Sequence, residues 1–161
     1  MSFDNAYRPY DAAAGYNAGY AAVNTSGVLS RRLLAYLIDI VAISILVILF
    51  SFLVTIIGAL TFGLGWILFG FLVPLTAILY SAITVGGPGQ GTVGMRMAGL
   101  RALDSETGAP VGFLVAGAHA LLFYVAAGTF LLLVCDVIIG MARGDRRMGH
   151  DLLTGVLLIR R

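Results

Sequence analysis

Apolar residues run with almost no interruption over residues 33–85, where Asp39 is the only charged side chain. A helix that crosses a bilayer needs about 20 predominantly apolar residues, so this stretch is long enough for two. Glycines cluster at residues 58–65 and supply the break between them. The pattern therefore predicts transmembrane helices at residues 31–57 and 65–85, joined by a short uncharged loop.

The residues before the first apolar run predict its orientation. Arg31 and Arg32 stand directly in front of it, and basic residues next to a span favour the cytoplasmic side. Residues 1–28 are rich in Ala, Gly, Asn and Tyr without periodicity, which predicts a disordered tail. The expected organisation is a cytoplasmic tail over residues 1–28 and a membrane domain over residues 29–161.

The polar stretch over residues 86–110 is rich in turn formers and predicts a structure outside the membrane. Within it, residues 100–103 have the character of a short strand, and so do residues 156–159 near the C-terminus. A β pairing of these two segments is a hypothesis with a topological consequence. Both segments must then lie on the same side of the membrane, in a small cytoplasmic cap.

The apolar stretch over residues 111–142 is ambiguous, because it is too long for one span and too short for two full ones. Arg143, Arg146 and Arg147 follow it immediately, and the positive-inside tendency places them in the cytoplasm. A pair of short helices hinged near residues 126–128 enters and returns, which satisfies both this charge bias and the strand pairing. We favour this re-entrant pair over a single tilted third span.

Composition supports a membrane protein. Sixty per cent of the 161 residues are hydrophobic and 11% are charged, with a mean hydropathy of +0.98, whereas soluble domains carry roughly 25% charged residues. The formal net charge of +2 indicates no nucleic-acid partner. The one cysteine, Cys135, lies in an apolar run, so it allows no intramolecular disulfide and suggests no zinc cluster.

Catalytic signatures are missing from the sequence. It contains no HExxH, CxxC or Walker-type phosphate loop, and no group of Ser, His and carboxylate at motif spacing. His150 and Asp151 form a mere dipeptide. We therefore expect a protein that is not an enzyme and that uses neither a cofactor nor a metal.

Asp39 is the sharpest candidate for a functional residue. A lone carboxylate at the centre of a membrane helix costs roughly 2.5–3.5 kcal/mol, so it usually has a partner or a task. Arg32 precedes it by seven positions, two helical turns, which puts both on one face. The sequence favours a structural ion pair of Asp39 with Arg32 or with an arginine of the C-terminal segment. The alternative is a carboxylate that titrates or binds a cation.

Two further polar residues interrupt the ambiguous apolar stretch. Asp136 lies about two turns from the end of its predicted helix, where it can reach interfacial water or Arg143. His119 is on a helical face rich in Ala and Gly, and we interpret it as a core histidine. A metal ligand or a proton relay is the minor alternative for His119.

Three blocks of the sequence resemble those of the RDD family, bacterial membrane proteins named for one arginine and two aspartates. Residues 32–39 (RLLAYLID) resemble the opening motif of the family. Residues 92–101 (TVGMRMAGLR) resemble its threonine-x-glycine-lysine-arginine segment, and residues 148–156 (MGHDLLTGV) its closing block. The three blocks stand in family order and cover nearly everything but the tail.

The resemblance implies that Arg32, Asp39 and Asp151 are the three named positions. It also implies an α-helical membrane protein related to transport. The chain departs from the family pattern before Arg96, where Met95 stands in place of the usual lysine. This puts in doubt any role that needs two adjacent cations there, such as holding an anion or a phospholipid headgroup.

Together these patterns predict an all-α integral protein of the bacterial cytoplasmic (inner) membrane, with two full transmembrane helices, the third apolar region and a small cap. We expect Arg32, Asp39 and Asp151 to form one charge cluster near the inner face. The secondary candidates are Arg96, Arg101, His119, Asp136 and Arg146. The first functional class is a small ion or solute transporter, as a homo-oligomer in the lipid bilayer. The alternative is a non-catalytic accessory subunit of a larger membrane complex.

Overall fold

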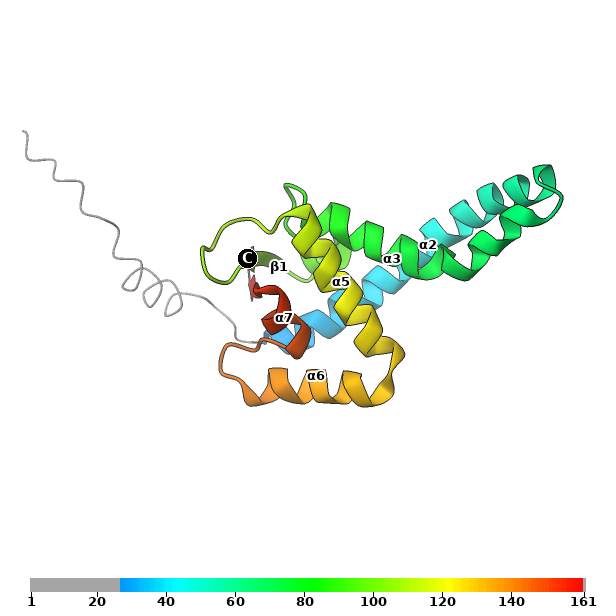
Figure 1. The fold of residues 1–161 in the computed structure, drawn as a ribbon. Helices are drawn as coiled ribbons and strands as arrows, with labels where there is room; N and C mark the ends of the chain where they lie inside the picture. Colours follow the sequence, from blue (N-terminus) through cyan, green and yellow to red (C-terminus); the bar gives the residue numbers. More distant parts are fainter. Residues whose placement is uncertain (1–26, 161) are drawn as a thin grey trace, which may run out of the picture.

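The computed structural model describes residues 27–160. A hairpin of two apolar segments dominates it: helix α2 (Val28–Leu60), and the 3-10 turn η1 (Leu64–Leu68) followed by α3 (Phe69–Val85) (Figure 1). Both segments are long and apolar enough to cross a membrane, which confirms the two predicted spans. The predicted disordered tail lies outside the described residues except for its last two positions, the second of which begins α2.

The tip of the hairpin is fixed by close packing between its two arms. A Cβ atom on Gly58 of α2 would overlap the ring of Trp66 in η1, so only glycine lets this ring lie against the helix backbone. Gly63 has a φ of +95°, a left-handed conformation that glycine adopts without strain. The glycines predicted to break the apolar run therefore shape the turn itself.

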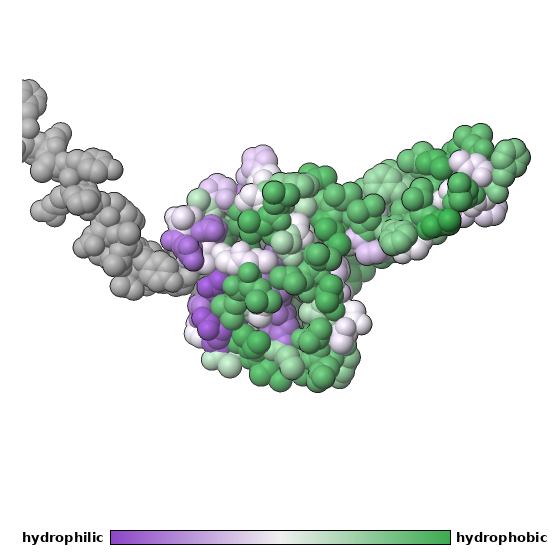
Figure 2. All heavy atoms as spheres, viewed as in Figure 1, coloured by the Kyte–Doolittle hydropathy of each residue, from purple (hydrophilic) through white to green (hydrophobic). Residues whose placement is uncertain are grey.

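A small cap lies at the opposite end of the hairpin. It contains the one-turn helix α4 (Val93–Met97), strand β1 (Leu100–Asp104), the short helix α7 (Gly149–Thr154) and strand β2 (Val156–Arg160). The two strands pair antiparallel, as predicted from the sequence. Figure 2 shows the hydrophilic surface gathered at this end of the molecule, while the projecting hairpin is almost entirely apolar.

The hydrophobic core sits where the strands meet the start of α2. Val28, Leu100 and Val156 have no exposed surface at all, and each belongs to a different one of these elements. Helix α4 directly precedes β1 in the chain and α7 directly precedes β2, and each helix contacts the strand that follows it. The cap is therefore anchored to the first turn of the first span.

The remaining apolar region folds into two helices, α5 (Phe113–Gly128) and α6 (Phe130–Ala142), bent by 119° relative to each other. The start of α5 lies against Gly86 at the end of α3. The end of α6, at Gly140, lies beside Leu29 at the start of α2. Both ends of the helix pair are thus at the cap end of the hairpin, which is the geometry of the predicted re-entrant pair.

Candidate functional site

Asp39 is buried between α2, α3 and the cap, and it accepts three hydrogen bonds. The Tyr80 hydroxyl donates to Oδ1 at 2.6 Å, and the Gly94 amide donates to the same oxygen at 2.8 Å. The Thr92 hydroxyl donates to Oδ2 at 2.5 Å. Three donors are sufficient to stabilise an ionised carboxylate away from water. Within residues 27–160 no arginine forms an ion pair with Asp39, so the predicted pair with Arg32 is wrong.

Two of the three donors to Asp39, Thr92 and Gly94, come from the beginning of α4. Thr92 caps this helix, because its side chain accepts the Met95 amide at 3.0 Å while its hydroxyl donates to Asp39. A Cβ atom on Gly94 would overlap the carbonyl oxygen of Ala35 in α2. Glycine at this position therefore lets the first turn of α4 lie directly against the first span.

Arg32 instead forms an ion pair with Asp151 of α7. Its Nη2 lies 2.6 Å from Asp151 Oδ2, which also accepts the Met148 amide at 2.8 Å. Asp151 is completely buried. Burial alone would raise the pKa of this carboxyl, but the guanidinium of Arg32 and two neighbouring histidines outweigh burial and hold the pKa below its ordinary value.

His150, next to Asp151 in the chain, is held by Asp136 of α6. Its Nδ1 lies 2.7 Å from Asp136 Oδ2, and its backbone amide donates to Asp136 Oδ1 at 2.9 Å. Both carboxylate oxygens of Asp136 thus bind the same residue. The predicted partner of Asp136, Arg143, pairs with Asp145 instead at 2.8 Å.

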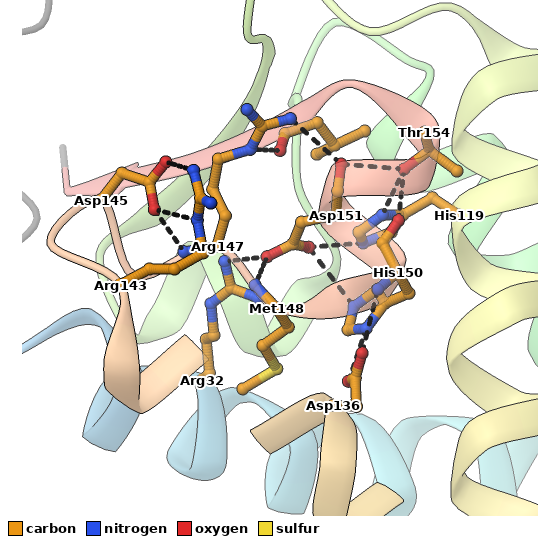
Figure 3. A network of polar contacts seen from close by, with 11 residues as sticks. Arg32, His119, Asp136, Arg143, Asp145, Arg147, Met148, His150, Asp151 and Thr154 are labelled. Carbon is orange, nitrogen blue, oxygen red and sulfur yellow. Dashed lines mark hydrogen bonds and ion pairs between the residues drawn. The ribbon is translucent and has the colours of Figure 1, made fainter. Parts of the chain in front are cut away.

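His119 of α5 completes the arrangement shown in Figure 3. Its Nδ1 lies 3.2 Å from the hydroxyl of Thr154, and that hydroxyl donates to the His150 carbonyl at 2.8 Å. Its Nε2 faces Asp151 Oδ1 at 3.7 Å, and His150 Nε2 faces the same oxygen at 3.3 Å. Elements far apart in the sequence therefore place two imidazoles against one buried carboxylate.

A cavity of about 540 Å³ opens beside both polar clusters, between the hairpin and the α5–α6 pair. Most of its wall is apolar. The polar side chains that line it are Arg32, Tyr36, Asp39, Ser81, Thr92, His119, Tyr124 and His150. The cavity is thus large enough for a small molecule or several waters, and ionisable groups form part of its wall.

The other candidates lie apart from this centre. Arg96 and Arg101 are exposed on the cap, and Arg146 donates to the carbonyl of Met141 at 2.9 Å. The predicted single cluster is therefore two separate sets of contacts, one around Asp39 and one around Asp151.

Sequence reasoning missed several residues of these sets, namely Tyr80, Thr92, His150 and Thr154. Thr92, two residues before Gly94 and at the start of a helix, carried the signal of an N-cap residue. His150 adjoins Asp151, but a dipeptide alone gives no indication that a second histidine lies across from it. The partners of Tyr80 and Thr154 depend on the tertiary fold, so no local pattern reveals them.

Comparison with known proteins agrees with the three sequence blocks. No curated protein and no solved structure matches the chain. The family model described as "RDD family" matches residues 27–155, which include the whole hairpin, the cap helices and the α5–α6 pair. This chain is a membrane protein that belongs to the RDD family.

Proposed function

We propose that this protein is a non-catalytic component of ion or small-solute transport across a bacterial cytoplasmic membrane. The observation that carries the proposal is the cavity of about 540 Å³ between the hairpin and the α5–α6 pair. Asp39, Arg32 and the two histidines line a space whose wall is mostly apolar. Ionisable groups that face a cavity within a membrane domain commonly mark the path of a substrate or an ion.

The backbone around the cavity supports the same proposal. The break between α5 and α6, at Thr129, interrupts a helix inside an apolar region. Non-helical backbone at membrane depth is tolerated where protein or a water-filled cavity covers it. A broken helix pair beside a cavity that contains ionisable groups is the arrangement that many transporters use for a binding site.

The arginines support an orientation with the cap and the N-terminus in the cytoplasm. Within residues 27–160, every arginine belongs to the first turn of α2, to the cap or to the segment that leads into it. The hairpin tip at residues 61–63 carries no charge. This asymmetry matches the positive-inside rule.

Two spans and a re-entrant pair enclose little volume, so we propose that transport requires a homo-oligomer.

The test of transport through the cavity is reconstitution of the purified protein into liposomes with ion-sensitive dyes or labelled solutes inside. Ala120 is buried and lines the cavity, whereas Ala118 lies on the exposed side of the same helix. Ala120→Leu should abolish flux and Ala118→Leu should leave it unchanged. Equal flux from both variants would contradict the cavity as the pathway.

A second candidate function is that of an accessory subunit in a larger membrane complex. The observation that favours it is the hairpin arm, which projects beyond α5 and α6 in Figure 1 and packs on no other element of the described chain. Along this half of α2 only Val54 and Gly58 are buried. Affinity purification in mild detergent at native expression level distinguishes the two functions. A stoichiometric larger partner favours the accessory role, and a lone homo-oligomer favours transport.

A further inference from the structure

We propose that His119, His150 and Asp151 bind a divalent transition-metal ion of the zinc type. One ligand atom from each residue lies within 4.8 Å of the other two, and the Nε2 atoms of both histidines face Asp151 Oδ1. The site is at the junction of α5 and α7 and forms part of the cavity wall. The proposal concerns a bound ion and does not depend on whether the protein transports anything.

Hydrogen bonding fixes the tautomer of each histidine. The Thr154 hydroxyl donates its only proton to the His150 carbonyl, so it accepts a hydrogen bond from His119 Nδ1. His150 Nδ1 lies 2.7 Å from a carboxylate oxygen of Asp136, which only accepts, so this nitrogen carries the proton. When both rings are neutral, as metal ligation requires, the lone pair is on Nε2, the atom that faces Asp151.

The three facing atoms are therefore all hydrogen-bond acceptors. Asp151 Oδ1 is fully buried and has no hydrogen-bond donor, while its other oxygen is occupied by Arg32 and the Met148 amide. Buried acceptors that face each other without a donor are costly, because each has lost its water. A cation placed between them removes this cost, because it binds the lone pairs of all three atoms.

The spacing fits a tetrahedral zinc site. Zinc–nitrogen and zinc–oxygen bonds of about 2.0–2.2 Å place neighbouring ligand atoms about 3.3–3.6 Å apart. The distances from Asp151 Oδ1 are 3.3 Å to His150 Nε2 and 3.7 Å to His119 Nε2. The three ligand atoms lie within 4.8 Å of one another, so metal binding would draw them together by up to about 1 Å to complete the geometry. Two imidazoles and a carboxylate leave a fourth position, which opens toward the cavity.

The groups around the three ligands hydrogen-bond to them and orient them, as the residues next to the ligands do in known metal sites. Asp136 holds His150, and Thr154 holds His119, so both rings are oriented by the nitrogen that does not bind the metal. Arg32 is the opposing charge, 2.6 Å from the second oxygen of Asp151. Asp136 and Asp151 carry the negative charges of the site, and a second guanidinium, that of Arg147, donates to the Asp151 carbonyl at 3.3 Å rather than to its carboxylate.

The test is direct metal binding to the full chain in detergent or nanodiscs, purified through a tag without histidine and stripped with a chelator. The two ligand histidines are the only ones in the chain, so histidine ligation seen by X-ray absorption identifies this site. We expect one Zn²⁺ per chain and a tetrahedral Co²⁺ spectrum in the visible range that Zn²⁺ abolishes. A thiolate-to-cobalt band would instead report Cys135, which is exposed on α6.

Variants separate a metal site from adventitious binding. His119→Gln should remove the tetrahedral Co²⁺ spectrum, and Asp136→Asn should weaken Co²⁺ affinity by roughly 10–100-fold through His150. Cys135→Ser is the matched control and should bind as the unchanged protein does. Circular dichroism and gel filtration establish that each variant is folded. If the folded wild-type chain binds no metal, or if His119→Gln binds Co²⁺ equally well, the proposal is wrong. A proton shared between Asp151 Oδ1 and a histidine Nε2 then accounts for their contact.

Discussion

Arg31 and Asp39 lie eight positions apart on α2 and hold opposite ends of the one-turn helix α4. The Arg31 guanidinium donates to the carbonyl of Ala98, just after the helix, at 2.6 Å. The Asp39 carboxylate accepts the Gly94 amide near the start of the helix at 2.8 Å. Each charge therefore meets the helix end of opposite partial charge, and α2 fixes the segment that leads into β1.

This contact makes Gly94 sensitive to any added side chain. Gly94→Ala should lower the free energy of unfolding by about 1–3 kcal/mol, because the new Cβ overlaps the Ala35 carbonyl and pushes α4 away from α2. The measurement is thermal or denaturant unfolding in detergent. Gly70→Ala is the matched control, since Gly70 is helical and has open space around it, and its stability should stay the same or rise slightly.

Asp39→Asn preserves shape and removes charge, and it should lower the free energy of unfolding by about 1.5–3 kcal/mol. The amide group offers one acceptor oxygen where the carboxylate offered two, so a donor from Tyr80 or Thr92 loses its partner. Asp145→Asn, at a partly exposed ion pair with Arg143, should cost no more than about 1 kcal/mol. Equal effects at the two positions would show that the buried hydrogen bonds of Asp39 contribute little.

The Arg32–Asp151 ion pair predicts strong coupling between its members. Arg32→Met and Asp151→Asn should each cost about 3–5 kcal/mol, because each leaves a buried charge without its partner. The double variant should cost clearly less than the sum of the two. A double-mutant cycle on unfolding free energies measures this coupling, and strictly additive costs would contradict the ion pair.

The depressed pKa of Asp151 predicts how its contribution depends on pH. A carboxyl whose pKa is lower in the folded state contributes stability above its unfolded pKa of about 3.9 and loses it as the pH falls toward the folded pKa. The difference in unfolding temperature between the wild type and Asp151→Asn should be constant from about pH 7 to pH 5 and shrink below about pH 4. A difference that grows as the pH falls would contradict this sign.

The fold was largely predictable because hydropathy and charge bias act over whole segments. The apolar stretch over residues 33–85 predicted two spans, and the arginines after residue 142 predicted that α5 and α6 return to the cap. The β pairing followed from two short strand-like segments that had to lie on one side. Each of these inferences rests on many residues, so no single contact decides it.

The polar contacts were not predictable in the same way. Helical spacing favoured a local pair of Arg32 with Asp39, but the partners of Asp39 are 41 to 55 positions away in the chain. The partner of Arg32 is in α7, near the other end of the sequence. The tertiary fold determines each of these partners. The spacing of two residues on one helix therefore does not reveal them.

The 119° bend between α5 and α6 also determines how the protein divides its volume across the bilayer. Helices α5 and α6 lie beside the cap half of the hairpin, and the hairpin arm projects beyond them (Figure 1). The cross-section in one leaflet is therefore greater than in the other, as for a wedge. Lipids of the two leaflets must pack around unequal areas, so the protein should favour membrane regions whose curvature relieves that difference.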